Sequence, residues 1–504
     1  MVASKLKQPQ ELESPFEQKD SRLLPTPFTY GAVLVSRIIS NECRLDASSY
    51  NMDVMNALNI VYKNSFGYIY LSGKDGLINT AYYPGRYKRI YTDVDNGIPF
   101  YLPSQLDEIY PKPTKYISQK TAFLLKDDYI KDKNLLLSRS GTIGKCAISS
   151  KTTIGKLFSD DVIRITFKKD YDLGYTYAFL NTEVGLTILQ SNNYGAVIDH
   201  IEPEHLSNIP IPNASVKLRE KIHDLVVSSF EMRDLSNKLI DQAESMLFAE
   251  LNIPQRLDSN SMQYDLDAGF CNFSLKASDL EGRLDVSYHL PEVENLLKEM
   301  YRNAANVITL GDHRISKSIC VGSRFKRIYV SKNNGIVYLN GKSINQLNPN
   351  GCQKKYLSFS QHEQRIKEEL IIKPNTILVT CSGTIGKVVL VPKHWDGWAG
   401  THDLIRIIPC DNSIAGYLFC YLNSNIGKIL LLRNAYGAVV DHIEPYHLQK
   451  TVIPILKNKK IQDKINDLVL EANDLRYQAH QKEQEAISMM NYILINRKNY
   501  VWIL

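Results

Sequence analysis

Two identical hexapeptides, Ser-Gly-Thr-Ile-Gly-Lys, contain the residue types that a phosphate-binding loop uses. They occupy residues 140–145 and 382–387. A P-loop needs four residues between its two glycines, and a Ser or Thr after the lysine. Here only two residues separate the glycines, and the lysine is followed by Cys in one copy and by Val in the other. The spacing therefore argues against nucleotide binding. Two interpretations remain: a glycine-rich turn between strands, or a turn whose N–H groups, with Lys145 and Lys387, contact a DNA phosphate.

Histidine and carboxylate side chains gather in a second pair of segments, at residues 199–205 and 441–447. Such side chains bind metal ions, and a metal-dependent hydrolase that uses His200, Glu202 and His205 is one interpretation, which stoichiometric zinc would support. The segment is not a His-Glu-x-x-His motif, however. The proline after the glutamate breaks any helix that would place both histidines on one face. A turn that caps the next short helix is the favoured interpretation.

Basic and aromatic side chains alternate in a third pair of segments, residues 86–91 and 324–329. Arginine and lysine neutralise phosphates and reach base edges. The period of two predicts a strand with one exposed face. A solvated strand face is the alternative for each single residue, but the same cluster in both halves favours DNA contact. The candidate DNA-binding residues here are Arg86, Lys88, Arg89, Arg324, Lys326 and Arg327.

The composition is that of a globular binding protein. The 504 residues are 44% hydrophobic and 23% charged, which suits about two to four domains. A net charge of +6 permits a nucleic-acid partner without requiring one. Asn-Pro-Pro-Tyr-type methyltransferase motifs, a Walker A motif and a paired nuclease motif are missing from the sequence. We therefore expect a binder and not an enzyme.

The cysteines and the hydropathy indicate the cellular compartment. The eight cysteines form no Cys-x-x-Cys pair, so a disulfide framework or a zinc knuckle is not expected. Residues 1–20 are polar and contain no apolar signal core. No run of eighteen apolar residues exists, so no membrane span is expected. We expect a cytoplasmic protein with reduced thiols.

Several motifs return in the second half at one constant offset. The glycine-rich hexapeptides, the Asp-x-Ile-Arg-Ile segments at 161 and 403, and the Asp-His-Ile-Glu-Pro segments at 199 and 441 all lie 242 residues apart. Related openings begin at Arg44-Leu45-Asp46 and at Arg283-Leu284-Asp285. A constant offset across several motifs indicates an internal duplication. The mixture of strand-like and turn-like segments predicts a mixed α/β unit, present twice.

Each unit ends in an Ile-Pro-Ile segment and is followed by a charged run with apolar residues at helical spacing. These runs predict two amphipathic, coiled-coil-like helices, each roughly 50 Å long, that bury their apolar stripes against one another. The expected domains are a first α/β domain at 1–213, a central long helix at 214–255, a second α/β domain at 256–455 and a C-terminal long helix at 456–504.

The duplicated order of the Arg-Leu-Asp openings, Ser-Gly-Thr-Ile-Gly-Lys turns, Gly-Ala-Val-(Ile/Val)-Asp-His-Ile joins and Ile-Pro-Ile segments resembles the specificity (S, HsdS-like) subunit of type I restriction-modification systems. The resemblance covers nearly the whole chain. It implies two target recognition domains, each reading one half of a split, asymmetric site in double-stranded DNA. It also implies that the antiparallel helices set the spacer between the half-sites.

The resemblance further implies partners and cofactors. The helices of this family dock two modification (methyltransferase) subunits, which use S-adenosylmethionine to methylate adenine, and restriction subunits add ATP- and Mg-dependent translocation and cleavage. No cofactor is expected in this chain. One alternative is the same scaffold in a methylation-only or other phage-defence complex. Another is a free-standing DNA-binding regulator with two modules, whose helices would self-associate.

Overall fold

The computed structural model describes residues 33, 35–40, 43, 51–141, 143–191, 200–254, 263–265, 270–280, 282–347, 349, 355–437 and 441–495. The chain divides into two compact units, residues 1–55 and 56–504. The first contains α1 (Val35–Ser40), and α2 (Met52–Tyr62) begins in it. The polar lead-in, the first Arg-Leu-Asp opening and most of the first Gly-Ala-Val join lie outside the described residues. All that follows concerns the second unit.

The second unit contains two domains with the same strand order. Each has a large four-stranded sheet, β2-β9-β6-β7 in the first domain and β14-β21-β18-β19 in the second. Each has a small four-stranded sheet, β3-β5-β4-β8 and β15-β17-β16-β20, and a two-stranded sheet, β1-β10 and β13-β22. The strands correspond one for one between the domains. The predicted duplication of a mixed α/β unit is confirmed.

The strands of the first domain are β1 (Tyr68–Tyr70), β2 (Ile78–Tyr82), β3 (Tyr91–Thr92), β4 (Gly97–Tyr101), β5 (Lys115–Ser118), β6 (Leu135–Ser138), β7 (Cys146–Ile148), β8 (Leu157–Phe158), β9 (Val162–Phe167) and β10 (Pro210–Pro212). A hairpin, β11 (Gln263–Asp265) and β12 (Phe270–Asn272), precedes the second domain. The strands of that domain are β13 (Asn306–Thr309), β14 (Ser316–Cys320), β15 (Tyr329–Val330), β16 (Gly335–Leu339), β17 (Tyr356–Ser358), β18 (Ile377–Thr380), β19 (Val388–Leu390), β20 (Ala399–Gly400), β21 (Leu404–Pro409) and β22 (Val452–Ile455).

The helices repeat in the same way. In and after the first domain they are α3 (Gln119–Leu124), α4 (Tyr171–Leu180), α5 (Glu183–Ser191) and α6 (Val216–Leu251). In and after the second they are α7 (Pro291–Asn303), α8 (Phe359–Arg365), α9 (Asn412–Asn423), α10 (Asn425–Leu432), α11 (Pro445–Gln449) and α12 (Lys459–Ile495). Among the helices of the described ranges, none combines the length and the apolar character that crossing a membrane requires.

Each core forms where a large sheet meets its helices. The central strands β6 and β18 are buried over their whole length, as their continuous apolar sequences predict. The apolar side chains of β6 join those of α4, α5 and the start of α6 in one cluster. Those of β18 join α9, α10 and the start of α12 in another. Each domain is therefore built onto the long helix that follows it.

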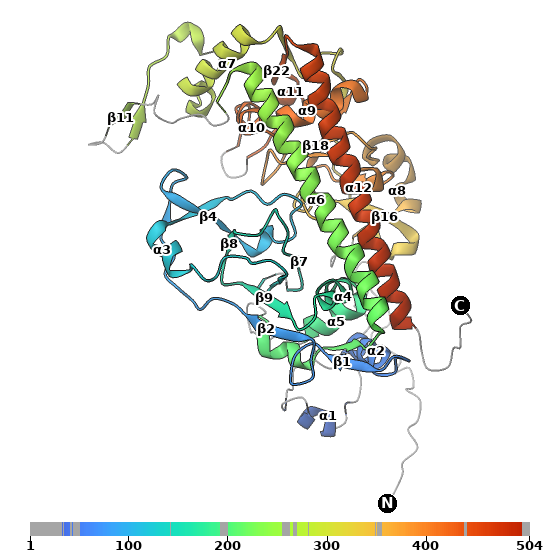
Figure 1. Cartoon of the computed structure of the whole chain (residues 1–504). Coiled ribbons are helices and arrows are strands. Elements are labelled where there is room, and N and C mark those ends of the chain that lie inside the picture. Colours follow the sequence, from blue (N-terminus) through green and yellow to red (C-terminus); the bar gives the residue numbers. More distant parts are fainter. Residues whose placement is uncertain are drawn as a thin grey trace, which may run out of the picture. The chain divides into compact units, whose positions relative to one another are not determined.

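The long helices α6 and α12 run side by side in opposite directions (Figure 1). The Arg233 guanidinium pairs with Glu483 at 2.7 Å, and Nε of Arg476 donates to Ser236 Oγ at 2.9 Å. A residue earlier in α6 thus meets a residue later in α12, so the helices are antiparallel. With 36 and 37 residues, each spans about 54 Å. The expectation that their apolar stripes cover one another is confirmed.

Glycines allow each domain to approach its helix closely. The Gly174 N–H in α4 donates to Nδ1 of His223 in α6 at 3.2 Å, and the Gly416 N–H in α9 donates to Oδ1 of Asn466 in α12 at 2.9 Å. A Cβ on Gly174 would lie 2.6 Å from the Cα of His223, and one on Gly416 would collide with the Asn466 carbonyl. These two crossings anchor the domains near the first turns of their helices.

Candidate nucleic-acid interface

The basic segments lead into β3 and β15, which are edge strands of the small sheets. Sequence analysis predicted strands over residues 86–91 and 324–329, but the strands comprise only the two residues of β3 and of β15. The partner strand β5 ends at Ser118, whose N–H donates to the Ile90 carbonyl at 2.8 Å. Helix α3 begins at the next residue. The residues before Ile90 therefore have no partner strand among the described residues.

Side chains nevertheless alternate along the first segment. Arg86 and Lys88 are exposed, whereas Tyr87 and Arg89 turn inward. Tyr87 packs against the apolar cluster under the small sheet, and burial raises its pKa to about 12. Neither Arg86 nor Lys88 forms an ion pair with any residue of the described ranges. Two cations of this segment thus remain available to a ligand.

The second segment repeats this pattern. Arg324 and Lys326 are exposed, and Phe325 packs against the apolar cluster of its small sheet. Within the part of the chain that the structure describes, Arg324 and Lys326 also make no ion pair. The two segments therefore present four exposed cations at equivalent places in the two domains.

Arg89 and Arg327 both contact other residues of their own domains, although Arg89 is half-buried and Arg327 is exposed. Arg89 pairs with Asp160, lies 3.9 Å from Asp161, and has its guanidinium 5.6 Å from the ring centroid of Phe100. These contacts tie the basic segment to the large sheet, because residues 160 and 161 directly precede β9. They compete with any contact that Arg89 would make to DNA.

In the second domain, Nη2 of Arg327 lies 2.9 Å from Nδ1 of His402, and its guanidinium lies 5.9 Å from the ring centroid of Tyr338. Residue 402 stands 242 positions after Asp160. Burial lowers the pKa of His402, and the charges of Arg327 and Arg324 lower it further, whereas Asp403 raises it. The sequence-based prediction identified neither Asp160 nor His402 as a partner. Their separation of 242 positions, the offset of the duplicated motifs, could have indicated that the two residues are equivalent.

An open groove lies beside the second basic segment, between β15, β16 and the first turn of α8. Its polar lining consists of Asn333, Asn334, Ser358, Ser360 and Gln361. Amide and hydroxyl groups of this kind form hydrogen bonds with base edges. The sequence alone did not single out these residues, because nothing local indicates that residues 333 and 334 face α8.

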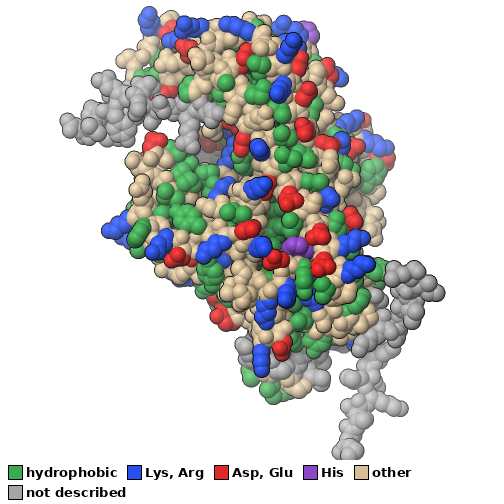
Figure 2. Space-filling model, in the orientation of Figure 1, with side chains coloured by type: hydrophobic (Ala, Val, Ile, Leu, Met, Phe, Trp, Pro, Cys, Tyr) green, Lys and Arg blue, Asp and Glu red, His purple; other side chains and the backbone are tan. Residues whose placement is uncertain are grey.

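The corresponding surface of the first domain carries different side chains. Gly97 pairs with Ser118 in the first domain, and Gly335 pairs with Ser358 in the second. Gly97 therefore corresponds to Gly335, and Ser118 corresponds to Ser358. The groove residues Asn333 and Ser360 then correspond to Asp95 and Lys120. On α3, Phe123 and Leu124 are each 71% exposed, where α8 has Glu363 and Gln364. Figure 2 shows Lys and Arg side chains gathered at the tip of the first domain, where α3 lies.

The glycine-rich hexapeptides form turns, as both of their interpretations predicted. Gly141, Gly144, Gly383 and Gly386 have positive φ angles of 72°, 97°, 74° and 79°, which favour glycine. A Cβ on Gly144 would lie 2.5 Å from Cδ1 of Leu186 in α5, and one on Gly386 would lie 2.9 Å from Cδ2 of Leu432 in α10. The glycines thus let α5 and α10 pack closely against the turns.

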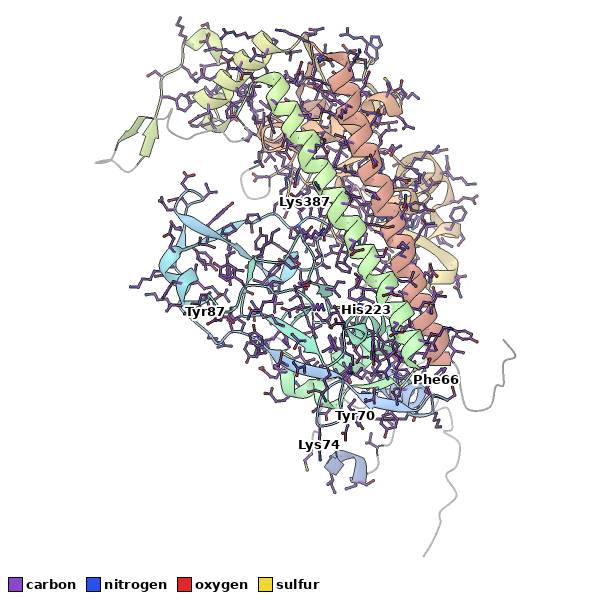
Figure 3. The ribbon with its side chains drawn as sticks, viewed as in Figure 1. Phe66, Tyr70, Lys74, Tyr87, His223 and Lys387 are labelled. Atoms are coloured by element: carbon purple, nitrogen blue, oxygen red, sulfur yellow. The ribbon has the colours of Figure 1, made fainter. Side chains whose placement is uncertain are left out.

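The lysines of these turns lie between the two domains. Nζ of Lys145 lies 2.8 Å from Oδ1 of Asp107, and both side chains are mostly buried. Lys387 lines a cavity of about 340 Å³ with Glu108, Lys112 and Lys428, among other residues. In Figure 3, Lys387 lies beside the middle of α6, away from Tyr87 in the first basic segment. The ion pair of Lys145 competes with the predicted phosphate contact.

The histidine-containing segments cap short helices, as predicted. In the first, the backbone N–H of Glu202 donates to Nδ1 of His205, and the Glu202 side chain caps the first turn of the 3-10 helix Pro203–Asn208. Glu202 also pairs with Arg139. Glu444 and His447 form the same cap on α11. No group of three metal-ligating side chains is found among the described residues.

No family model and no curated protein matches this chain. Solved structures do match. The chain is similar to specificity subunits of type I restriction-modification systems. With the type I restriction-modification S subunit from M. genitalium it shares 13% identity and a TM-score of 0.33, over 83% of this chain and 93% of that chain.

Two further matches are of the same kind. The HsdS subunit from Thermoanaerobacter tengcongensis is 10% identical with a TM-score of 0.23, over 84% of this chain and 99% of that chain. A chain from a structure of complex assembly and conformational transition in the type I R-M system is 11% identical with a TM-score of 0.26, over 81% of this chain and 94% of that chain.

The eight residues that the sequence patterns suggested for DNA contact fall into two groups. Arg86, Lys88, Arg324 and Lys326 are exposed beside the small sheets and make no ion pair within the described ranges. Arg89, Arg327, Lys145 and Lys387 contact other residues of the protein or line the cavity between the domains.

Proposed function

We propose that this chain is the DNA-specificity subunit of a type I restriction-modification complex, and that each α/β domain reads one half of a bipartite, asymmetric site. The observation that carries the proposal is one scaffold with two surfaces. The strand orders are the same in both domains, and four exposed cations occupy equivalent places. The neighbouring side chains of the two surfaces differ.

The chemistry of these surfaces fits such a division of labour. Phosphate contacts position a protein on DNA without reading sequence, whereas contacts to base edges specify it. Arg86, Lys88, Arg324 and Lys326 are the proposed phosphate contacts. Asn333, Asn334 and Gln361 carry the amides that read base edges in the second domain. The first domain has Asp95 and Lys120 nearby, so its half-site differs from that of the second domain.

The antiparallel helices fit the role of a ruler. Arg233 and Arg476 occupy equivalent positions in α6 and α12, and each side chain forms a hydrogen bond with the opposite helix. An approximate twofold axis therefore passes through the middle of the pair, with one domain anchored toward each end. Twofold symmetry in a DNA-binding protein matches paired half-sites at a fixed distance.

The remaining parts of the proposal concern partners and cofactors. The outer sides of α6 and α12 are uncovered in the view of Figure 1, and there they would dock two modification subunits and, through the complex, restriction subunits. S-adenosylmethionine, ATP and Mg²⁺ would act in those partners, and this chain would be non-catalytic. The same surfaces would serve a methylation-only or other phage-defence complex, which differs only in its neighbouring subunits.

One observation bears on the regulator alternative. A free-standing regulator was expected to self-associate through its helices. Here the apolar stripe of α6 is covered by α12 of the same chain. That arrangement leaves no apolar stripe for such self-association among the described residues of the two helices, and it favours the specificity-subunit proposal.

The test is co-expression with a candidate modification (methyltransferase) subunit from the same organism, followed by single-molecule sequencing of host DNA for methylated adenine. The expected result is one bipartite motif with two unlike half-sites and a fixed gap. A soluble complex that methylates nothing would overturn the restriction-modification role. Tight, sequence-specific DNA binding by the chain alone, without any complex, would support the regulator instead.

A further inference from the structure

The two domains also touch each other directly, at the approximate twofold axis. Glu108 lies opposite Gln346 in an antiparallel bridge. The Ile109 N–H donates to the Asn345 carbonyl at 2.9 Å, and the Leu347 N–H donates to the Asp107 carbonyl at 2.5 Å. Residues 345 and 347 are the counterparts of 107 and 109, because each lies 238 positions later, the same offset that separates Gly335 from Gly97 in the neighbouring strands. The two hydrogen bonds are thus related to each other by the same twofold operation that relates the domains.

This central contact, residues 107–109 with 345–347, is also bonded to the helix pair. The Ile109 carbonyl accepts a hydrogen bond from Nδ2 of Asn237 in α6 at 3.0 Å. Oδ1 of Asn237 accepts one from Nη2 of Arg476 in α12 at 3.3 Å. One continuous chain of hydrogen bonds therefore links the second domain, the first domain, α6 and α12.

Side chains add to the contact from both domains. Leu347 belongs to the second domain but packs in the apolar core of the first. Asp107 holds the Lys145 ammonium, and the charge of Lys387, from the second domain, also favours the Asp107 carboxylate. The two lysines of the duplicated hexapeptides thus act on the same carboxylate. The counterpart of Asp107 is Asn345, so the charged part of the contact is asymmetric.

The position of the contact matters because of how the domains are anchored. Each domain packs along its own helix, with the closest approaches at Gly174 and Gly416 and with further polar contacts nearer the helix middle, at Asp234 of α6 and Asp474 of α12. These contacts fix each domain on a helix but do not join the two domains to each other. The central contact does join them, and it restrains relative motion, which is the usual expectation for domains that share a small interface.

We infer that the central contact fixes the distance between the two DNA-reading surfaces, and hence the number of base pairs between the half-sites, together with the helices. The part concerning base pairs rests on the proposed function. The part concerning distance does not, because the contact orients the domains whatever they bind.

The distance is testable on the full chain without DNA. Dyes are placed at the exposed positions 120 and 363 through an unnatural amino acid, and single-molecule energy transfer is recorded. The wild type is expected to show one population. Asp107→Arg puts a third cation beside Lys145 and Lys387, and a second, longer-distance population is expected.

Two further variants control this result. Asp107→Arg with Lys145→Glu restores an opposite charge and is expected to recover the single population. Asp75→Arg makes the same charge change at an exposed turn and is expected to leave the distance unchanged. If Asp107→Arg does not fold, Leu347→Ala weakens the contact by a different route. A folded Asp107→Arg or Leu347→Ala with the wild-type distance overturns the inference.

The gap, meaning the number of base pairs between the two half-sites, is tested in cells by sequencing the methylated motif. The wild type is expected to give one gap length, and Asp107→Arg to give additional ones. A wild type without bipartite methylation would reject the proposed function, while the distance measurement would still decide on the contact. A variant with altered distance but an unchanged gap would assign the spacing to the helices alone and overturn the inference for the gap.

Discussion

Arg327 donates a hydrogen bond to Nδ1 of His402 at the place where Arg89 of the first domain pairs with Asp160. The guanidinium is the same in both domains, but its partner is an imidazole in one and a carboxylate in the other. A protonated imidazole has no acceptor for an N–H and repels a guanidinium. Mild acid therefore weakens the Arg327–His402 contact more than the corresponding Arg89–Asp160 contact.

The first prediction follows from the sign of the shift at His402. Burial and the charges of Arg327 and Arg324 lower its pKa in the folded state, against the opposing charge of Asp403. The unfolded chain then binds the proton more readily, so stability falls as pH drops below about 6.5. Hydrogen exchange, corrected for intrinsic rates, is expected to increase over residues 324–330 from pH 7 to 5.5. His402→Asp is expected to abolish this increase, whereas equal increases at residues 86–92 would contradict the mechanism.

A second prediction compares two arginines of one segment. Arg89→Ala leaves the largely buried carboxylate of Asp160 without its partner, which is expected to cost about 2 kcal/mol in the free energy of unfolding. Arg86→Ala removes an exposed side chain and is expected to change that energy by less than about 0.5 kcal/mol. Denaturant unfolding of both variants checks the difference. Equal effects would show that the Arg89–Asp160 pair is not structural.

The third prediction concerns DNA. Arg86→Ala with Lys88→Ala is expected to weaken binding uniformly across sequences and to lower the slope of log affinity against log salt by about one per lost phosphate contact. Arg324→Ala with Lys326→Ala is expected to do the same in the second domain. Fluorescence anisotropy at several salt concentrations measures the slope. Lys63→Ala, an exposed cation on neither segment, serves as the control, and a slope equal to the control would remove these residues from the interface.

Sequence alone predicted the duplication, the two long helices and the turns at the hexapeptides, because each leaves a local or periodic pattern. It did not predict the inward turn of Arg89 or the pairing of Lys145. Their partners, Asp160 and Asp107, are 71 and 38 residues away, and no local period encodes such a contact. The strand predicted over residues 86–91 failed for the same reason, since its length depends on where the partner strand β5 ends.

The fourth prediction concerns two stacked histidines. The rings of His394 and His480 lie 3.9 Å apart between centroids, with 13° between their planes. Burial lowers the pKa of His394 to about 3, with contributions from His480 and Arg233, and burial lowers that of His480 although Glu483 raises it. The folded state therefore binds protons at these two histidines less readily than the unfolded chain does, so stability is lost as pH falls below about 6.5.

His394 alone contributes a slope of up to about 1.4 kcal/mol per pH unit below the unfolded-state pKa, and His480 adds to it in the same direction. His394→Phe with His480→Phe is expected to keep the stack and flatten the decline of the free energy of unfolding between pH 6.5 and 4.5. Chemical denaturation at several pH values measures it. His313→Phe, which replaces an almost fully exposed imidazole, is the matched control and is expected to retain the wild-type decline.

The last prediction concerns the ion pair between Arg233 and Glu483 at the middle of the helices, where both side chains are buried. Removing one partner leaves a buried charge unpaired, and Glu483→Leu alone is expected to cost about 3–5 kcal/mol. Arg233→Met with Glu483→Leu is expected to cost far less, because neither charge remains. Tyr177 also donates its hydroxyl to Glu483, so Tyr177→Phe belongs in the full replacement.

A stability of the triple variant close to that of the wild type would mean that the pair contributes little net free energy, as is common for buried ion pairs. Its value then lies in register, because a one-turn slip of α12 along α6 would bury the Arg233 charge without its carboxylate partner. The energy-transfer distance between the domains is therefore expected to broaden in the triple variant even where its unfolding midpoint does not change. An unchanged distance would assign the register to the apolar stripes alone.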